Sequence, residues 1–271
     1  MRSPASQKPT SLSSVVVSMF LIGVILCSSF LVGCGASSST APADQTYVFK
    51  PFLALHVCLD NTLSYPVQFQ HEALQNIADR IDSYITPNMG GMLVDVNLIE
   101  ANSLQDTFVT FSVPAIPAIP PKPQAGGNDP YKFSLAMRDW KKTVAQVNSL
   151  AASVRANIKP YLDTLRSFHK QEVGGTDIPG CADTASGEFS HFPKGNKLLL
   201  YISDLQSNID VNFSKHINLF GAKVRVIFMP CQLQSACSQL QAYYTQQFTA
   251  WNASSVEFFS PAESEAEKIT F

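Results

Sequence analysis

An apolar run that ends abruptly in a polar turn constrains the fold of this chain more than any other feature. Residues Phe52 to Leu59 are almost continuously apolar, and Asp60-Asn61-Thr62-Leu63-Ser64 follows directly. A short run of this kind is typical of a strand in a sheet that is covered on both faces. The turn places one carboxylate and two hydroxyls, at alternate positions, where the strand meets solvent. Because Mg²⁺ prefers oxygen ligands, the turn predicts a site for a hard divalent cation.

The first 33 residues have the pattern of an export signal. Arg2 and Lys8 make the start weakly positive, and an apolar stretch follows from Val15 to Val32. The stretch ends in Leu31-Val32-Gly33-Cys34, which resembles the lipobox of bacterial lipoproteins. The resemblance implies a signal peptide over 1–33, a lipid such as palmitate on the Cys34 sulfur, and an extracytoplasmic protein anchored to the cell membrane. The residues themselves leave open a single uncleaved membrane anchor.

The rest of the chain divides into a tether and one domain. Residues 34–46 are rich in Ser, Ala and Pro and predict a flexible tether, whereas 47–271 is long enough for one sizeable domain. No second apolar run reaches the roughly 18 residues of a spanning helix. Without Arg2 and Lys8, 17 basic residues face 21 acidic ones, and no basic cluster stands out. This charge pattern argues against nucleic acid or an anionic membrane surface as partner.

Strand and helix patterns alternate along the domain and predict an α/β fold. We expect a single doubly wound, Rossmann-like domain whose mostly parallel central sheet has about six strands, with helices on both faces. The expected strands are 52–59, 92–99, 107–113, 197–203, 223–229 and 255–259, and the expected helices follow Pro66 and cover 140–168 and 240–251.

Residues 114–160 look like an insertion in this pattern. A Pro- and Gly-rich stretch predicts an extended surface path, and a helix with an apolar stripe from Trp140 to Ile158 follows it. We expect Pro160 to kink or restart that helix. The stripe is expected to pack against the domain's own sheet, with a partner-binding face as the alternative.

Four cysteines remain after Cys27 and Cys34 are assigned to the signal and the lipid. An exported protein can form disulfides, and Cys231 and Cys237 are close enough in sequence to predict a local bridge. Cys58 lies inside the first apolar run and is expected to be a buried thiol. None of the spacings matches a zinc-binding C-x₂-C pattern. His56, in the same run, is expected to be a hydrogen-bonded core or edge residue rather than a metal ligand.

Three short segments rich in side-chain oxygens follow predicted strands or open a helix. In a doubly wound sheet, ligands bind at the carboxyl ends of the strands. These oxygen-rich points are Asp60-Asn61-Thr62-Leu63-Ser64, Gly174-Gly175-Thr176-Asp177-Ile178 and Asp204-Leu205. Together they resemble the metal-ion-dependent adhesion site (MIDAS) of von Willebrand factor type A (vWA) domains, which carries D-x-S-x-S, a Thr in a G-G-T-x-I loop, and an Asp often followed by Gly. Thr62 keeps the hydroxyl of the commoner Ser, and Leu205 replaces the Gly.

The resemblance implies a role for each of the five residues. Thr62 and Ser64 would bind the cation directly, Asp60 and Asp204 would act mainly through water, and Thr176 would bind directly or through water. The implied cofactor is Mg²⁺, or else Mn²⁺ or Ca²⁺. Two largely indirect carboxylates leave such an ion incompletely neutralised, so an acidic side chain of a protein partner can complete the site. The implied function is a non-enzymatic binding or adhesion module.

Two other functions compete with this interpretation. A phosphatase of the haloacid dehalogenase type also places an Asp after its first strand, with Asp60 as nucleophile and Ser203 as phosphate binder. That family has a second acid where this chain has Thr62, which speaks against it. A solute-binding lipoprotein of a transporter is the other alternative, disfavoured because a two-lobed organisation is not evident. Neither a nucleophile-elbow G-x-S-x-G nor a P-loop is present.

Overall fold

A computed structural model describes residues 50–104, 107–124, 129–169, 174–207, 217–228 and 234–260 of the chain. The chain divides into two units, Met1–Gln45 and Thr46–Phe271, and all the described residues belong to the second. The signal, the tether and Cys34 lie outside the described residues and stay predictions. Within the described part, no helix is long and apolar enough to cross a membrane.

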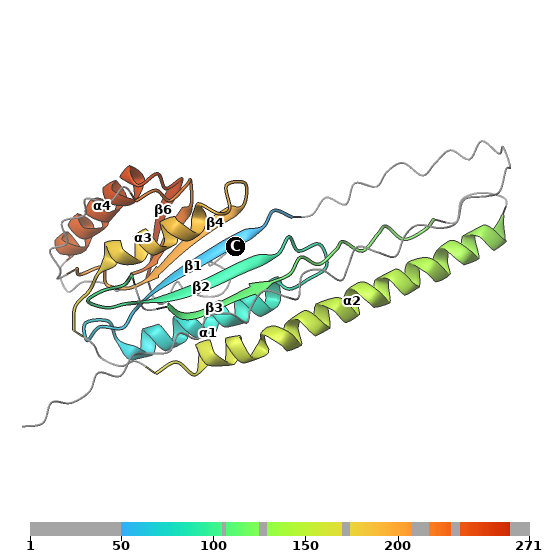
Figure 1. Cartoon of the computed structure of the whole chain (residues 1–271), viewed down its shortest axis with the longest axis horizontal. Coiled ribbons are helices and arrows are strands. Elements are labelled where there is room, and N and C mark those ends of the chain that lie inside the picture. Colours follow the sequence, from blue (N-terminus) through green and yellow to red (C-terminus); the bar gives the residue numbers. More distant parts are fainter. Residues whose placement is uncertain are drawn as a thin grey trace, which may run out of the picture. The chain divides into compact units, whose positions relative to one another are not determined.

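One six-stranded sheet forms the centre of the second unit (Figure 1). Its strand order is β3-β2-β1-β4-β5-β6, an order found in doubly wound α/β folds. All neighbouring strands are parallel except β3, which pairs antiparallel with β2 at one edge. The strands are β1 (Leu53–Asp60), β2 (Met92–Ile99), β3 (Thr107–Val113), β4 (Asn196–Ile202), β5 (Lys223–Ile227) and β6 (Ser255–Phe259). The predicted α/β fold is confirmed.

Strand β1 lies at the centre of the sheet, and all eight of its residues are buried. Alternate side chains enter two different cores: Leu55 and Val57 face one layer, whereas Ala54 and Cys58 face the other. Apolar side chains are therefore needed on both faces, which explains the continuous run in the sequence. Each Leu or Val that is fully buried contributes about 1.5–3 kcal/mol to folding.

Two helices cover each face of the sheet (Figure 1). Helices α1 (Val67–Tyr84) and α2 (Pro130–Arg166) pack on one face, and α3 (Ile178–Phe189) and α4 (Gln234–Ala250) pack on the other. Helix α1 begins directly after Pro66, whose fixed φ suits an entry into a helix. These layers confirm the predicted helices on both faces.

Pro160 lies inside helix α2, so of its two predicted effects, a kink or a restart, the restart is wrong. The helix does not restart there but continues from Pro130 to Arg166 with Pro160 inside it. Ile158, Leu162 and Leu165 are buried in the core on either side of the proline, so tertiary packing holds the helix together despite the missing backbone donor. The apolar stripe packs on the domain itself, as expected.

The proline-rich segment after β3 lies against α2. Residues 114–124 form no strand or helix beyond an isolated bridge between Ile116 and Met89. The indole Nε1 of Trp140 donates a hydrogen bond of 2.8 Å to the carbonyl oxygen of Pro120. This hydrogen bond holds the extended segment against the first half of α2. The sequence did not reveal that the segment packs on this helix.

The prediction that Cys58 is a free thiol is wrong. Cys58 on β1 and Cys181 on α3 form a disulfide that spans 123 residues of sequence, with their Cα atoms 6.0 Å apart. The bond became possible because α3 crosses β1 and places Cys181 over Cys58. Cys237 on α4 is also disulfide-bonded. Its predicted partner, Cys231, lies outside the described residues, so that pairing stays a prediction.

Candidate metal centre

The first and third oxygen-rich points lie where the strand order of the sheet reverses. Asp60 is the last residue of β1, and Asp204 follows the neighbouring strand β4. The chain leaves β1 toward β2 on one side and leaves β4 toward β5 on the other, so these two strands flank the topological switch point. Loops at a switch point separate from each other and leave room for a ligand.

Asp60 is fully buried, and both oxygens of its carboxylate accept hydrogen bonds. Oδ1 accepts from the backbone N–H of Thr62 at 2.9 Å and from the Thr62 hydroxyl at 2.6 Å. Oδ2 accepts from the hydroxyl of Ser203 at 2.6 Å. Asp60 is therefore fixed in orientation and acts on its neighbours through hydrogen bonds.

The hydroxyl oxygens of Thr62 and Ser64 lie 3.1 Å apart. Adjacent oxygen ligands on octahedral Mg²⁺, with bonds of 2.0–2.1 Å, are separated by about 2.9 Å. The Thr62 hydroxyl gives its proton to Asp60, so its lone pairs remain available for a cation. Thr62 is 4% exposed, whereas Ser64 is exposed, so the pair lies at the boundary between core and solvent. The two hydroxyls fit a hard cation.

Thr176 lies in a loop that a glycine makes possible. Gly175 has φ +95°, and a Cβ there would stand 2.8 Å from the Cβ of Ala101, so only glycine fits without strain. Thr176 is 1% exposed, and its carbonyl oxygen accepts a 2.9 Å hydrogen bond from the Ser207 hydroxyl. Ser207 belongs to the loop that begins at Asp204. The second and third oxygen-rich loops are thus in direct contact.

Asp177 anchors the same loop to the rest of the edge. Its carboxylate accepts a 2.8 Å bond from the backbone N–H of Gly180 and so caps helix α3. Its backbone N–H donates to the carbonyl of Glu100, and Glu100 accepts in turn from the side chain of Asn61 at 2.7 Å. These bonds join the loops after β1 and β2 to the loop before α3.

The turn after β4 keeps a left-handed backbone without glycine. Leu205 has φ +56° and is fully buried. Its N–H donates to the Ser203 hydroxyl at 2.9 Å, and the Asp204 carboxylate accepts from the N–H of Gln206 at 2.9 Å. Leu205 therefore adopts the conformation for which glycine is favoured, and its side chain joins the core. The substitution leaves the Asp204 turn formed.

Burial raises the pKa of Asp60 above its usual value. The hydrogen bonds from Ser203 and Thr62 oppose this shift, and the negative charge of Asp204 adds to it. Burial, followed by the charges of Asp60 and Asp204, also raises the pKa of Tyr65. Two carboxylates that repel each other in a buried place are stabilised by a cation, so the electrostatics and the hydroxyl spacing fit the same ligand.

Sequence reasoning missed the part that Ser203 and Gln70 take in this arrangement. Ser203 connects Asp60 to the backbone of Leu205, and the Gln70 side chain donates to the backbone carbonyl of Asp60. Ser203 stands directly before Asp204 at the end of a buried strand, which is the signal that could have identified it. Gln70 is a polar residue on the buried side of α1.

The chain is similar to several solved structures, with low TM-scores and low sequence identity. A von Willebrand factor type A structure from Catenulispora acidiphila matches with a TM-score of 0.40 and 13% identity, over 81% of this chain and 41% of that one. The pilus adhesin SpaC from Lactobacillus rhamnosus GG matches at 0.42 and 11%, over 81% and 29%. An aerotolerance-related membrane protein from Bacteroides fragilis matches at 0.37 and 12%, over 80% and 96%.

The chain has a doubly wound, Rossmann-like α/β fold, which is the fold that the resemblance to vWA domains implies. The order and directions of the strands show this fold, and superpositions at such scores add nothing about the fold, ligands or partners. The chain spans less than half the length of the first two structures named. No protein-family model matches the chain, and no curated protein matches it.

Proposed function

We propose that the chain is a binding module that holds an acidic side chain of a protein partner through a divalent cation. The cation would bind among Thr62, Ser64 and Thr176, with Asp60 and Asp204 acting mainly through water. The observation that carries the proposal is the pair of hydroxyl oxygens 3.1 Å apart, of which the Thr62 oxygen is oriented by the Asp60 carboxylate. When bound, the cation would supply an incompletely neutralised positive charge to which a carboxylate is attracted.

The surroundings of these residues suit a protein partner. Leu63, between the two hydroxyl residues, is 69% exposed, and Leu104, in the loop after β2, is 44% exposed. An exposed apolar side chain between two of the ligands, as Leu63 is, provides area that a partner can cover, while the ion sets the partner's orientation. The predicted lipid anchor on Cys34 would hold the domain outside the cytoplasm at the membrane.

The geometry of Asp60 disfavours the enzymatic alternative. A nucleophilic aspartate needs a free oxygen facing the substrate, but Asp60 is fully buried and both its oxygens accept hydrogen bonds. Ser203, the phosphate binder in that alternative, donates its proton to Asp60 itself. An aryl phosphatase activity that disappears in Asp60→Asn would favour the enzyme over the binding module.

Binding of acidic peptides tests the proposal. The purified protein would be probed with a peptide library and its counterpart in which every Asp and Glu is replaced by Asn and Gln. We expect peptides that bind in Mg²⁺ but not in EDTA, and whose binding disappears in the amide counterpart and in the Thr62→Val variant. A set of peptides that binds equally in EDTA would contradict the proposal. The matched control is Thr164→Val, which alters an exposed helical threonine.

A further inference from the structure

A second group of ligand-type side chains lies on the α3 side of the sheet, away from the carboxyl edge. His56 on β1 stands opposite Asp95 on β2 in the parallel register, and Glu188 on α3 covers both. His56 Nδ1 is 2.8 Å from Glu188 Oε2 and 3.3 Å from Asp95 Oδ2. Three different elements thus bring one imidazole nitrogen and two carboxylate oxygens to one point.

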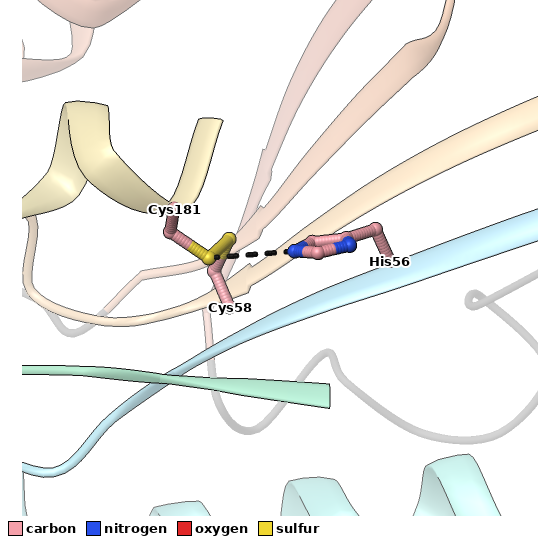
Figure 2. A group of neighbouring side chains, drawn as sticks. All are labelled: His56, Cys58 and Cys181. Atoms are coloured by element: carbon pink, nitrogen blue, oxygen red, sulfur yellow. Dashed lines mark hydrogen bonds between the residues drawn. A yellow bond between two sulfur atoms is a disulfide. The ribbon is translucent and has the colours of Figure 1, made fainter. Parts of the chain in front are cut away.

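The second ring nitrogen of His56 contacts the disulfide (Figure 2). His56 Nε2 lies 3.7 Å from Cys181 Sγ, and Cys181 is bonded to Cys58. His56, Cys58 and Cys181 also lie within ligand distance of one another. Because both sulfurs are used in the disulfide, neither is a thiolate, and the cysteines are excluded as metal ligands. Only the Nδ1 side of His56 can take part in a metal site.

We propose that His56, Asp95 and Glu188 form a binding site for a first-row divalent metal of the Zn²⁺ class. Zinc takes imidazole nitrogen at 2.0–2.1 Å and carboxylate oxygen at 2.0–2.2 Å, so tetrahedral donors lie about 3.3 Å apart. The Asp95–His56 separation of 3.3 Å already has this value. Glu188 Oε2, at 2.8 Å, needs to move by only about half an ångström.

Unpartnered polar atoms give an independent indication of a ligand. Within the part of the chain that the structure describes, Glu188 Oε1 is buried without a hydrogen-bond partner. Both side-chain amide atoms of Asn97, which is 1% exposed and two residues after Asp95 on the same face of β2, also lack one. Buried polar atoms without partners are costly and rare in native proteins. A metal ion that carries water would satisfy the Glu188 oxygen.

The electrostatics and access of the group favour the same ligand. Two carboxylates compete for the single Nδ1 position of His56. A divalent cation would neutralise both acids together. The Asp95 and Glu188 side chains are 11% and 12% exposed, so the site has an opening. Asp95 is oriented from behind by the hydroxyl of Thr110 on the edge strand β3, as outer-shell partners orient metal ligands.

The ligand set also sets this site apart from the oxygen-rich edge. Imidazole favours zinc, cobalt and similar ions, whereas hydroxyl and carboxylate oxygens favour Mg²⁺. The inference does not depend on the proposed binding function. The two sites are therefore separable by choosing the metal.

Cobalt provides the test. Four-coordinate Co²⁺ with a nitrogen ligand absorbs visible light more strongly than six-coordinate Co²⁺ with oxygen ligands alone. We expect the purified protein to develop this absorption with one equivalent of Co²⁺, and Zn²⁺ to displace it. In Glu188→Gln and in Asp95→Asn the Co²⁺ Kd should rise by at least roughly 10- to 100-fold, since outer-shell changes alone have that effect. Circular dichroism checks that each variant is folded. If one of the two variants does not fold, the other still tests the site.

Two controls identify the source of the signal. Glu257→Gln alters a carboxylate that pairs with Arg225 on the other edge of the sheet and should leave the Co²⁺ spectrum unchanged. Thr62→Val should also leave it unchanged while changing Mg²⁺ binding. No visible absorption, or the same spectrum in Glu188→Gln and Asp95→Asn, would overturn the inference and leave an ordinary hydrogen-bonded cluster. Loss of the spectrum in Thr62→Val alone would assign the cobalt to the other site and also overturn it.

Discussion

Thr62 is bonded twice to the same oxygen of Asp60, through its backbone N–H at 2.9 Å and through its hydroxyl at 2.6 Å. The backbone bond closes the turn at the end of β1, and the hydroxyl bond fixes the rotamer of Thr62. The buried carboxylate thereby holds a neutral oxygen next to the Ser64 hydroxyl, and its own charge lies behind that oxygen. This arrangement is the physical basis for a weakly neutralised cation at this edge.

Removing the Ser203 hydroxyl should weaken both the fold and cation binding. In Ser203→Ala, Asp60 Oδ2 loses the donor that holds it, and a buried acceptor is left without that bond. We expect a loss of about 1–3 kcal/mol in the free energy of unfolding, measured by urea titration, together with a weaker Mg²⁺ affinity. Ser83→Ala, which removes an exposed hydroxyl, should change stability by less than about 0.5 kcal/mol. Equal stabilities for the two variants would contradict this role of Ser203.

The left-handed conformation of Leu205 predicts an unusual order of two variants. Both Leu205→Ala and Leu205→Gly lose buried packing worth about 2–5 kcal/mol. Only glycine also removes the cost of φ +56°, which is about 1–2 kcal/mol for an L-residue. Leu205→Gly should therefore unfold at a higher urea concentration than Leu205→Ala, although glycine is usually the more destabilising of the two. The opposite order would show that this backbone is not strained.

The Cys58–Cys181 disulfide should contribute substantially to stability. It closes a loop of 123 residues, for which the chain-entropy model gives about 4.9 kcal/mol. The double variant Cys58→Ala/Cys181→Ala should lose about this much in the free energy of unfolding. Removing the much shorter predicted Cys231–Cys237 loop should cost only about 2 kcal/mol. Peptide mapping without reduction checks both pairings, and a Cys58 peptide that is not linked to Cys181 would contradict the structure.

Burial of Asp60 predicts how stability changes with pH when no metal is bound. Its pKa in the folded protein is raised above 3.8, so the folded state binds that proton more tightly than the unfolded state. The contribution of Asp60 is therefore largest at low pH and is lost as the pH rises through the folded pKa. In EDTA, wild type should lose stability relative to Asp60→Asn as the pH is raised from 3.8 into the neutral range. A constant difference over this range, measured by urea unfolding, would contradict the shift.

The sequence predicts the layers of this fold well because each strand carries its own pattern. The runs at 92–99, 107–113 and 255–259 became β2, β3 and β6 with the predicted bounds. The continuous apolar run of β1 indicated burial on both faces. The three loops that carry Asp60, Thr176 and Asp204 could be recognised because each follows or precedes such an element.

What the sequence did not reveal depends on contacts between distant elements. The Cys58–Cys181 bond and the His56–Glu188 contact both require the placement of α3 over β1, which no local pattern encodes. The helix through Pro160 likewise follows from packing on both sides of the proline rather than from local propensity. In each case tertiary placement decided between structures that the local sequence allows.

Calorimetric titration of Mg²⁺ into the purified protein tests the central claim most directly. The claim is that the Asp60, Thr62 and Ser64 turn forms one cation site with Thr176 and Asp204. We predict a binding heat for wild type and for the control Thr164→Val, and none for Asp60→Ala or for Thr62→Val, which removes the hydroxyl at nearly constant shape. Equal heats in wild type, Asp60→Ala and Thr62→Val, all verified as folded, would contradict the site.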